Sequence, residues 1–256
     1  MFSKWFGKAR KEPVRAERKP SRPAGGTAWP EEALMAAIAK QKQVDPLVGA
    51  KIGGKEVLER LLRVMKDDKG VHVESLFCAL GALAGYACQA SLRGQAIVRG
   101  VDPNAPFNVV QTEDGGTYFF GDLLNGALAE ERLSVWTLAA GAAQHHGATS
   151  LPDINEIFKR TASAVGTAQF GVPRAIPGHA AGALPAAYLR NLWPALLPIV
   201  KKLAGDPVLW PLVYAFAIQE AIAMAKGTLD LHTALTLVME AAIPMSKVEL
   251  SALQGA

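Results

Sequence analysis

The sequence predicts a mainly α-helical protein: a single globular helical domain of about eight to ten helices, with one small antiparallel β-hairpin or meander at residues 95–120. Three observations predict this fold. Apolar residues recur at helical spacing over most of the chain after residue 30. Helix-starting residues precede these segments, as at Pro30 and at Asp206-Pro207. Strand and tight-turn signals are concentrated in one short stretch.

The chain divides near residue 30 into a basic amphipathic tail with a flexible linker, residues 1–29, and a helical globular domain, residues 30–256. Pro, Arg, Lys, Gly and Ala dominate residues 12–28, which cannot bury enough apolar surface to order themselves. Residues 1–22 carry eight basic and two acidic side chains, or +6, whereas the remaining residues sum to −2. A body without basic excess is not expected to bind nucleic acid.

The first helices are expected from Pro30 onward, over 54–66 and over 73–92. The 54–66 segment is the clearest amphipathic helix, with apolar residues along one face. Ion pairs at i,i+4 spacing are expected on its other face: Glu56–Arg60 and Glu59–Arg63. The nearly uncharged 73–92 helix is expected at the centre of the core.

The 95–120 stretch is expected to contain strands, at Ala96–Val98, Phe107–Gln111 and Thr117–Phe120. The Asp-Gly dipeptide at 114–115 supplies the tight turn that a hairpin needs. Because an isolated two-stranded hairpin is marginally stable, it should pack on helices or gain a third strand.

Helices are then predicted at 122–130, 133–146 and 152–165, with Ser150 to Asp153 as a capping box before the last of these. Glycine and proline make residues 166–183 a long loop. The final helices are predicted at 185–203, 207–226 and 231–243. Pro194 and Pro198 should kink or split the first of them.

Cys78 and Cys88 lie ten residues apart in one apolar stretch. On a helix this separation is about 15 Å, too far for a disulfide. We therefore expect buried free thiols and a cytoplasmic location. Residues 76–92 and 207–225 approach the composition of membrane spans, but we interpret both as core helices. No signal peptide is recognised at the N-terminus.

The tail has the pattern of an interfacial anchor for an anionic membrane or an acidic partner. On a helical wheel its aromatic side chains fall opposite its lysines, and the predicted contact residues are Phe2, Lys4, Trp5, Phe6, Lys8 and Lys11. The alternative is a disordered solubilising leader whose aromatic residues are incidental.

Residues Gly49 to Lys55 match the G-x4-G-K spacing of a phosphate-binding loop. The chemistry of that loop requires Ser or Thr after the lysine to hold Mg²⁺, but Glu56 stands there. No strand precedes the glycines either. We interpret the segment as a glycine-rich start of the 54–66 helix.

The 166–183 loop is our preferred place for a ligand or partner contact, through Phe170, Arg174 and His179, because loops of this length are often functional. The alternative is an ordered structural crossover. His145 and His146, with Glu156, are weak metal-ligand candidates. Adjacent histidines diverge on a helix, and a helix C-terminus favours histidine without any metal. No metal or cofactor is expected.

The sequence contains no G-x-S-x-G, H-E-x-x-H or C-x-x-C motif. The leading hypothesis is a non-enzymatic cytoplasmic protein that binds another protein, as an adaptor, immunity or accessory protein, and associates peripherally with a membrane or acidic partner through its tail. The alternative is an enzyme or small-molecule-binding protein with a site between the apolar helices and the 166–183 loop. A third reading is a partner-neutralising protein of the immunity or chaperone kind. The oligomeric state is left open.

Overall fold

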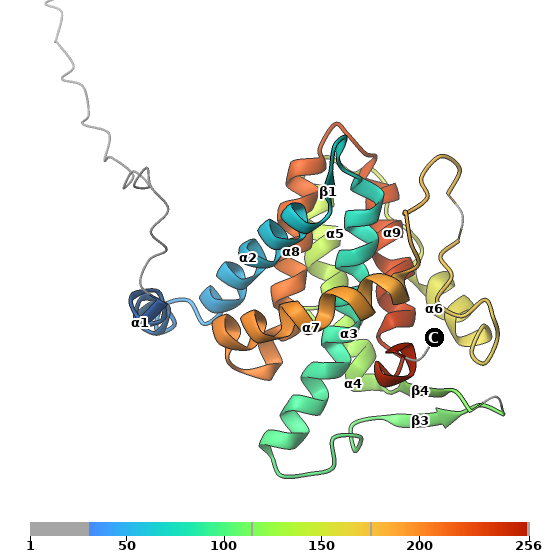
Figure 1. Cartoon of the computed structure of the whole chain (residues 1–256), viewed down its shortest axis with the longest axis horizontal. Coiled ribbons are helices and arrows are strands. Elements are labelled where there is room, and N and C mark those ends of the chain that lie inside the picture. Colours follow the sequence, from blue (N-terminus) through green and yellow to red (C-terminus); the bar gives the residue numbers. More distant parts are fainter. Residues whose placement is uncertain (1–30, 114, 175, 255–256) are drawn as a thin grey trace, which may run out of the picture.

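The computed structural model describes residues 31–113, 115–174 and 176–254, and it confirms the mainly α fold (Figure 1). The proposed tail and linker, residues 1–29, lie outside the described residues. The longer helices are α1 (Glu31–Gln41), α2 (Val48–Val64), α3 (Val73–Val98), α5 (Val135–His145), α6 (Ile154–Ser163), α7 (Pro185–Ala204), α8 (Trp210–Ala225) and α9 (Leu231–Met245). Shorter helical turns are α4 (Asp122–Asn125), the π-helical η1 (Gly126–Glu130), and the 3₁₀ turns η2 (Pro207–Leu209) and η3 (Ser251–Gln254).

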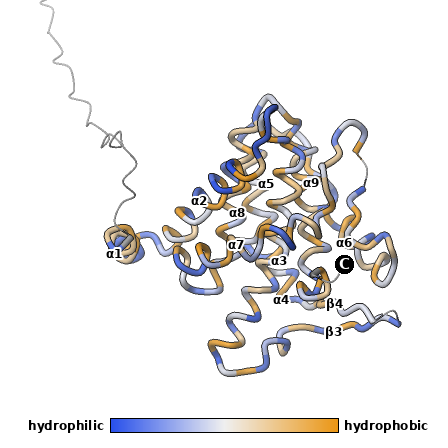
Figure 2. The backbone as a smooth tube through the Cα atoms, in the orientation of Figure 1, coloured by the Kyte–Doolittle hydropathy of each residue, from blue (hydrophilic) through white to orange (hydrophobic). Residues whose placement is uncertain are grey.

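Helix α3 lies at the centre of the fold, as expected for its apolar sequence, and packs against α7, α8 and α9 (Figures 1 and 2). Its contact with α9 is especially close. A Cβ atom at Gly81 would lie 2.2 Å from the Val238 carbonyl oxygen, and one at Gly85 would lie 2.0 Å from the Ala242 carbonyl oxygen. The two helix backbones can therefore approach at this distance only because both α3 positions lack a side chain.

Among the residues that the structure describes, two helical segments are long and apolar enough to cross a membrane by length and composition, Val73–Val98 and Pro207–Ala225. Their most apolar windows are 94% and 61% buried inside the fold, respectively. This burial supports the interpretation of both as core helices.

The prediction of a strand at Ala96–Val98 is wrong, because these residues form the last turn of α3. Ala96 is buried, while Ile97 and Val98 face solvent. The helical hydrogen bonding continues from Arg99 N to the Gln95 carbonyl oxygen, and the side-chain amide of Gln95 donates to Ser91 Oγ one turn earlier. β-Branched residues lower helix propensity by only tenths of a kcal/mol, so an extended helix overrides them.

The predicted hairpin is present as β3 (Asn108–Gln111) and β4 (Thr117–Phe120), paired antiparallel with Val109 opposite Phe119. It also gains the expected third partner. Tyr118 forms an isolated bridge with Val248, and the backbone N–H of Phe119 donates to the Lys247 carbonyl at 2.9 Å. The segment after α9 thereby ties the hairpin to the helices.

A second strand pair, β1 (Lys66–Asp67) and β2 (Gly70–Val71), was not predicted. It is a tight turn between α2 and α3, in which the Asp67 carboxylate accepts a hydrogen bond from Lys69 N. Two-residue strands have too little sequence pattern to be recognised. On the preceding helix, the expected Glu56–Arg60 ion pair is present at 2.7 Å.

Helix α6 is capped by Asp153 and not by Ser150, which corrects the predicted capping box. The Asp153 carboxylate accepts hydrogen bonds from Asn155 N and Glu156 N, whereas Ser150 Oγ lies 3.2 Å from His232 Nδ1. Helix α7 remains one assigned helix through Pro194 and Pro198, so these prolines do not split it. The predicted cap at Asp206 is confirmed by its hydrogen bond from Val208 N.

Candidate functional site

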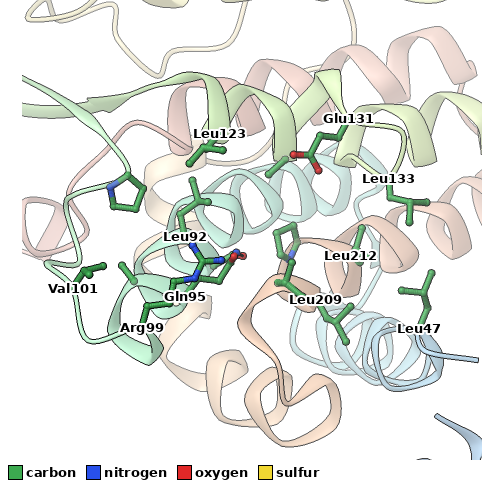
Figure 3. Close-up of a pocket in the computed structure, with 16 residues that line it drawn as sticks. Leu47, Leu92, Gln95, Arg99, Val101, Leu123, Glu131, Leu133, Leu209 and Leu212 are labelled. Atoms are coloured by element: carbon green, nitrogen blue, oxygen red, sulfur yellow. Dashed lines mark hydrogen bonds between the residues drawn. The ribbon is translucent and has the colours of Figure 1, made fainter. Parts of the chain in front are cut away.

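A hollow of about 420 Å³ lies at the C-terminal end of α3 (Figure 3). We call it the α3-end groove. Its walls come from α3, from the segment α4–η1, and from η2 and the start of α8; Leu92, Leu123 and Leu212 are among its lining residues. The π-helical turn η1 forms part of one wall through Ala127. Wide turns of this kind are rare and often occur at functional positions.

Exposed apolar side chains surround the α3-end groove. Five of them line it or the adjoining hollow that shares Gln95, Arg99 and Val208 with it, and together we call them the apolar rim: Val98, Val101, Leu123, Leu133 and Val208. Val98 is 77% exposed and Leu123 is 57% exposed. Contiguous exposed apolar surface is costly in water and commonly marks an interaction site.

Two charged side chains of opposite sign also line the groove. Arg99 follows the end of α3, and Glu131 follows η1 on the facing wall (Figure 3). Within the described part of the chain, neither side chain forms an ion pair. The groove therefore combines apolar walls with one cationic and one anionic group that can each receive a partner's charge.

A smaller cavity of about 320 Å³ lies beneath the 166–183 loop. Cys78 of α3 and Leu237 of α9 line it from the body, and Arg174 and His179 line it from the loop. Phe170, the third loop residue that we predicted, packs edge-to-face on Tyr118 instead, with ring centroids 4.7 Å apart. The structure therefore brings two of the three predicted loop residues to one cavity.

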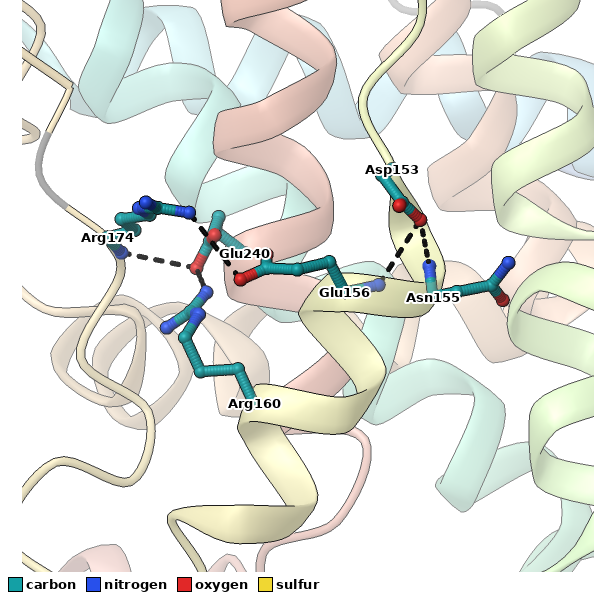
Figure 4. Close-up of polar contacts among 6 residues, drawn as sticks. All are labelled: Asp153, Asn155, Glu156, Arg160, Arg174 and Glu240. Carbon is teal, nitrogen blue, oxygen red and sulfur yellow. Dashed lines mark hydrogen bonds and ion pairs between the residues drawn. The ribbon is translucent and has the colours of Figure 1, made fainter.

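Polar contacts around Glu240, a buried carboxylate of α9, connect the 166–183 loop to the helices (Figure 4). Glu240 is only 3% exposed; it pairs with Arg160 of α6 and accepts a hydrogen bond from Arg174 N at 3.2 Å. The Arg174 guanidinium in turn lies 3.5 Å from Glu156 Oε1. Sequence reasoning missed Glu240 and Arg160. A single acidic residue in an otherwise apolar helix indicates a buried carboxylate with a partner, and this pattern could have identified Glu240.

Near the other end of the loop, two further polar contacts connect it to α3. His179 Nδ1 lies 3.0 Å from Glu74 Oε1, and Gly182 N donates to Ser75 Oγ at 2.9 Å. Burial of the Glu74 carboxyl opposes ionisation, but its hydrogen bond with His179 and its contact with His72 leave its pKa below the usual value. Glu74 is thus an anionic partner for the loop histidine.

The predicted metal candidates are not brought together. His145 and His146 end α5 beside Glu220, whereas Glu156 lies on α6 and pairs with Arg174. Among the described residues, no group of three or more His, Cys, Asp or Glu side chains is arranged to hold a metal ion. The weak candidates His145, His146 and Glu156 therefore do not form such a group in the described part of the chain.

The glycines of the phosphate-loop-like segment lie inside α2, which begins at Val48, earlier than predicted. A Cβ at Gly49 would lie 2.3 Å from the Leu203 carbonyl oxygen, and one at Gly54 would lie 2.8 Å from the Val213 carbonyl oxygen. These glycines therefore allow α2 to pack closely against α7 and α8.

Both cysteines are buried free thiols, as expected. Burial raises the pKa of Cys78 and of Cys88 to about 12, so neither is a thiolate nucleophile at neutral pH. Lys247 is also buried, and its ammonium donates to Asn125 Oδ1 at 2.9 Å beside the Phe120 ring. Burial lowers the pKa of this lysine to about 8.

Comparisons with protein-family models, with curated proteins and with solved structures find no match to this chain.

Proposed function

We propose that this protein is a non-enzymatic accessory or adaptor protein that binds an apolar segment of a partner protein in the α3-end groove. The observation that carries the proposal is the groove together with its apolar rim. Six exposed apolar side chains of Val, Ile or Leu gather around this end of α3: the apolar rim and Ile97. Burying such surface against a partner gains about 25 cal/mol per Å².

The occupant that fits best is a short amphipathic helix of the partner. A groove between helices commonly receives apolar side chains from one face of such a helix. Arg99 and Glu131 add charge complementarity, since the partner helix would place an acidic side chain near Arg99 and a basic one near Glu131. These charges set the register and orientation of the partner more than the affinity.

Site-specific photo-crosslinking tests this proposal. A photoreactive residue at Leu123 or at Val208 should crosslink the full chain to the same heterologous protein in cells, through an amphipathic helical segment of that protein. The matched control position is Met224, an exposed apolar residue of α8 that lines neither hollow. Crosslinking only between copies of this chain, or equal partner yields from position 224, would overturn the proposal.

Binding of the purified partner gives a second readout. Leu133→Asp should weaken binding at least tenfold, because it places an unpaired carboxylate in an apolar contact. Met224→Asp should leave the affinity unchanged. Arg99→Glu should also weaken binding, and the loss of affinity that it causes should be smaller at high salt, which screens charge interactions.

The second half of the proposal is that residues 1–22 hold the protein at an anionic membrane. Its support is the charge division of the sequence, +6 in this segment against −2 in the rest, and the helical-wheel projection of the sequence, which puts Phe2, Trp5 and Phe6 opposite the lysines. Each Lys or Arg near an anionic bilayer contributes about 1 kcal/mol of attraction.

Deletion of residues 2–22 should abolish co-sedimentation with phosphatidylserine-containing liposomes and leave the thermal melt unchanged. Liposomes of phosphatidylcholine alone are the control, and they should bind neither protein. Equal sedimentation of the full and truncated chains would refute membrane anchoring. Binding of the full chain to an acidic protein but not to the anionic liposomes would assign the tail to a protein partner.

A further inference from the structure

The cavity beneath the 166–183 loop shares no lining residue with the α3-end groove. Its walls are built from both the helices and the loop. Cys78 and Leu237, both buried, face it from α3 and α9, and Val172, Ile176 and Ala183 face it from the loop. Its volume of about 320 Å³ falls at the lower end of the range for small-molecule sites.

The loop that covers this cavity is held on both sides of it. On one side, Arg174 N donates to the buried Glu240 carboxylate. On the other, Gly182 N donates to Ser75 Oγ, and His179 contacts Glu74. These contacts join the loop to α3 and α9, so the cavity has a fixed wall on each side.

The polar groups of the lining are confined to the loop side, apart from the Cys78 thiol. Arg174 and His179 provide them, and each has donor capacity beyond the contact already described. The Arg174 guanidinium uses one nitrogen in a long, exposed contact with Glu156, which is a weak pair that a better acceptor can displace. His179 uses Nδ1 toward Glu74, which leaves its Nε2.

Apolar walls with the Arg174 guanidinium and a His179 ring nitrogen on one side suit a molecule with an apolar body and one anionic end. We propose that this cavity binds a small amphipathic carboxylate, with the carboxylate at Arg174 and His179 and the apolar body against Ala183, Ile176 and Leu237. Arginine suits this role because its planar guanidinium can hold both oxygens of a carboxylate. The site is independent of the partner-binding groove, so either proposal can fail alone.

Isothermal titration calorimetry of the full chain with octanoate tests the proposal, with octanol and octylamine as probes of the same chain length. Octanoate should bind at one site, and octanol and octylamine should each bind at least tenfold more weakly, because neither presents a carboxylate to the Arg174 guanidinium. Equal affinity for octanoate and octanol would overturn the assignment of a carboxylate. The absence of octanoate binding at millimolar concentration would overturn the site altogether.

Variants locate the binding. Ala183→Phe, at an exposed lining position, should fill the cavity and abolish octanoate binding, whereas Ala168→Phe, exposed on the same loop outside the lining, should not. Arg174→Leu should weaken octanoate binding about tenfold or more and leave octanol binding unchanged. Lys159→Leu removes the same charge from α6, outside the cavity, and should retain full affinity. Unchanged octanoate affinity in Ala183→Phe, with circular dichroism as the check on folding, would refute this location.

Discussion

The close contact between α3 and α9 predicts that alanine at Gly85 destabilises the protein, although alanine is the better helix former. In a helix interior, replacing glycine by alanine gains about 0.5–1 kcal/mol. At position 85, however, the new Cβ would lie 2.0 Å from the Ala242 carbonyl oxygen. Ordinary contact between heavy atoms requires about 3.5 Å, so α9 would have to move by about 1.5 Å. Overpacking of a buried contact costs about 1–3 kcal/mol, and a backbone clash lies at the upper end.

The expected net loss is therefore about 1–2 kcal/mol for Gly85→Ala, measured as a lower midpoint of urea unfolding at constant slope. Gly141→Ala is the matched control, because Gly141 lies in α5 and a Cβ there would meet no atom within 4 Å. That variant should be stabilised by up to about 1 kcal/mol. A Gly85→Ala midpoint equal to or above that of the unmodified protein would refute the steric argument, as would destabilisation of both variants by the same amount.

Two further perturbations address the buried charges. Glu240→Ala should lower the free energy of unfolding, measured in urea, by about 3 kcal/mol, because Arg160 and Arg174 N lose a buried acceptor. Glu240→Gln should lower this free energy by a smaller amount. Glu56→Ala, which removes an exposed ion pair with Arg60, should lower it by less than about 1 kcal/mol. Similar losses from Glu240→Ala and Glu56→Ala would contradict this account. The pKa of Lys247 is about 8 in the folded state, below its ordinary value of 10.5. Between pH 8 and pH 10.5 the unfolded chain therefore binds more protons than the folded chain, and the free energy of unfolding should rise with pH over this range. Lys247→Met should remove up to about 3 kcal/mol of that rise, measured by urea unfolding at several pH values, and an identical pH profile in both proteins would exclude the effect.

Most helices could be predicted because their signals are local. Asp206 and Pro207 start one segment through their own side chains, and the apolar stripe of 54–66 belongs to one helix. The error at Ala96–Val98 arose where local preference and the surrounding helix disagree. Ile97 and Val98 favour strands, but each residue added to an existing helix gains a hydrogen bond without the unfavourable free energy of starting a new helix.

The candidate sites were less accessible to sequence reasoning, because their walls come from distant segments. Leu92, Leu123 and Leu212 reach one groove only after three parts of the chain fold together. The 166–183 loop was found by its length and composition, and Arg174 and His179 do line a cavity there. Their carboxylate partners, Glu240 and Glu74, lie more than 60 residues away in the sequence. Local sequence patterns do not predict contacts between residues that far apart.

The position of α3 in the chain has a consequence for synthesis. This helix is long and apolar enough to enter a membrane, and α8 and α9, which cover it, are translated more than a hundred residues later. At about 5–20 residues per second, roughly 7–30 seconds pass between the synthesis of the last residue of α3 and that of the last residue of α9. During this interval the nascent chain presents a hydrophobic segment to chaperones and to the insertion machinery. The residues that make the finished core stable are thus the ones that most need protection while the protein is being made.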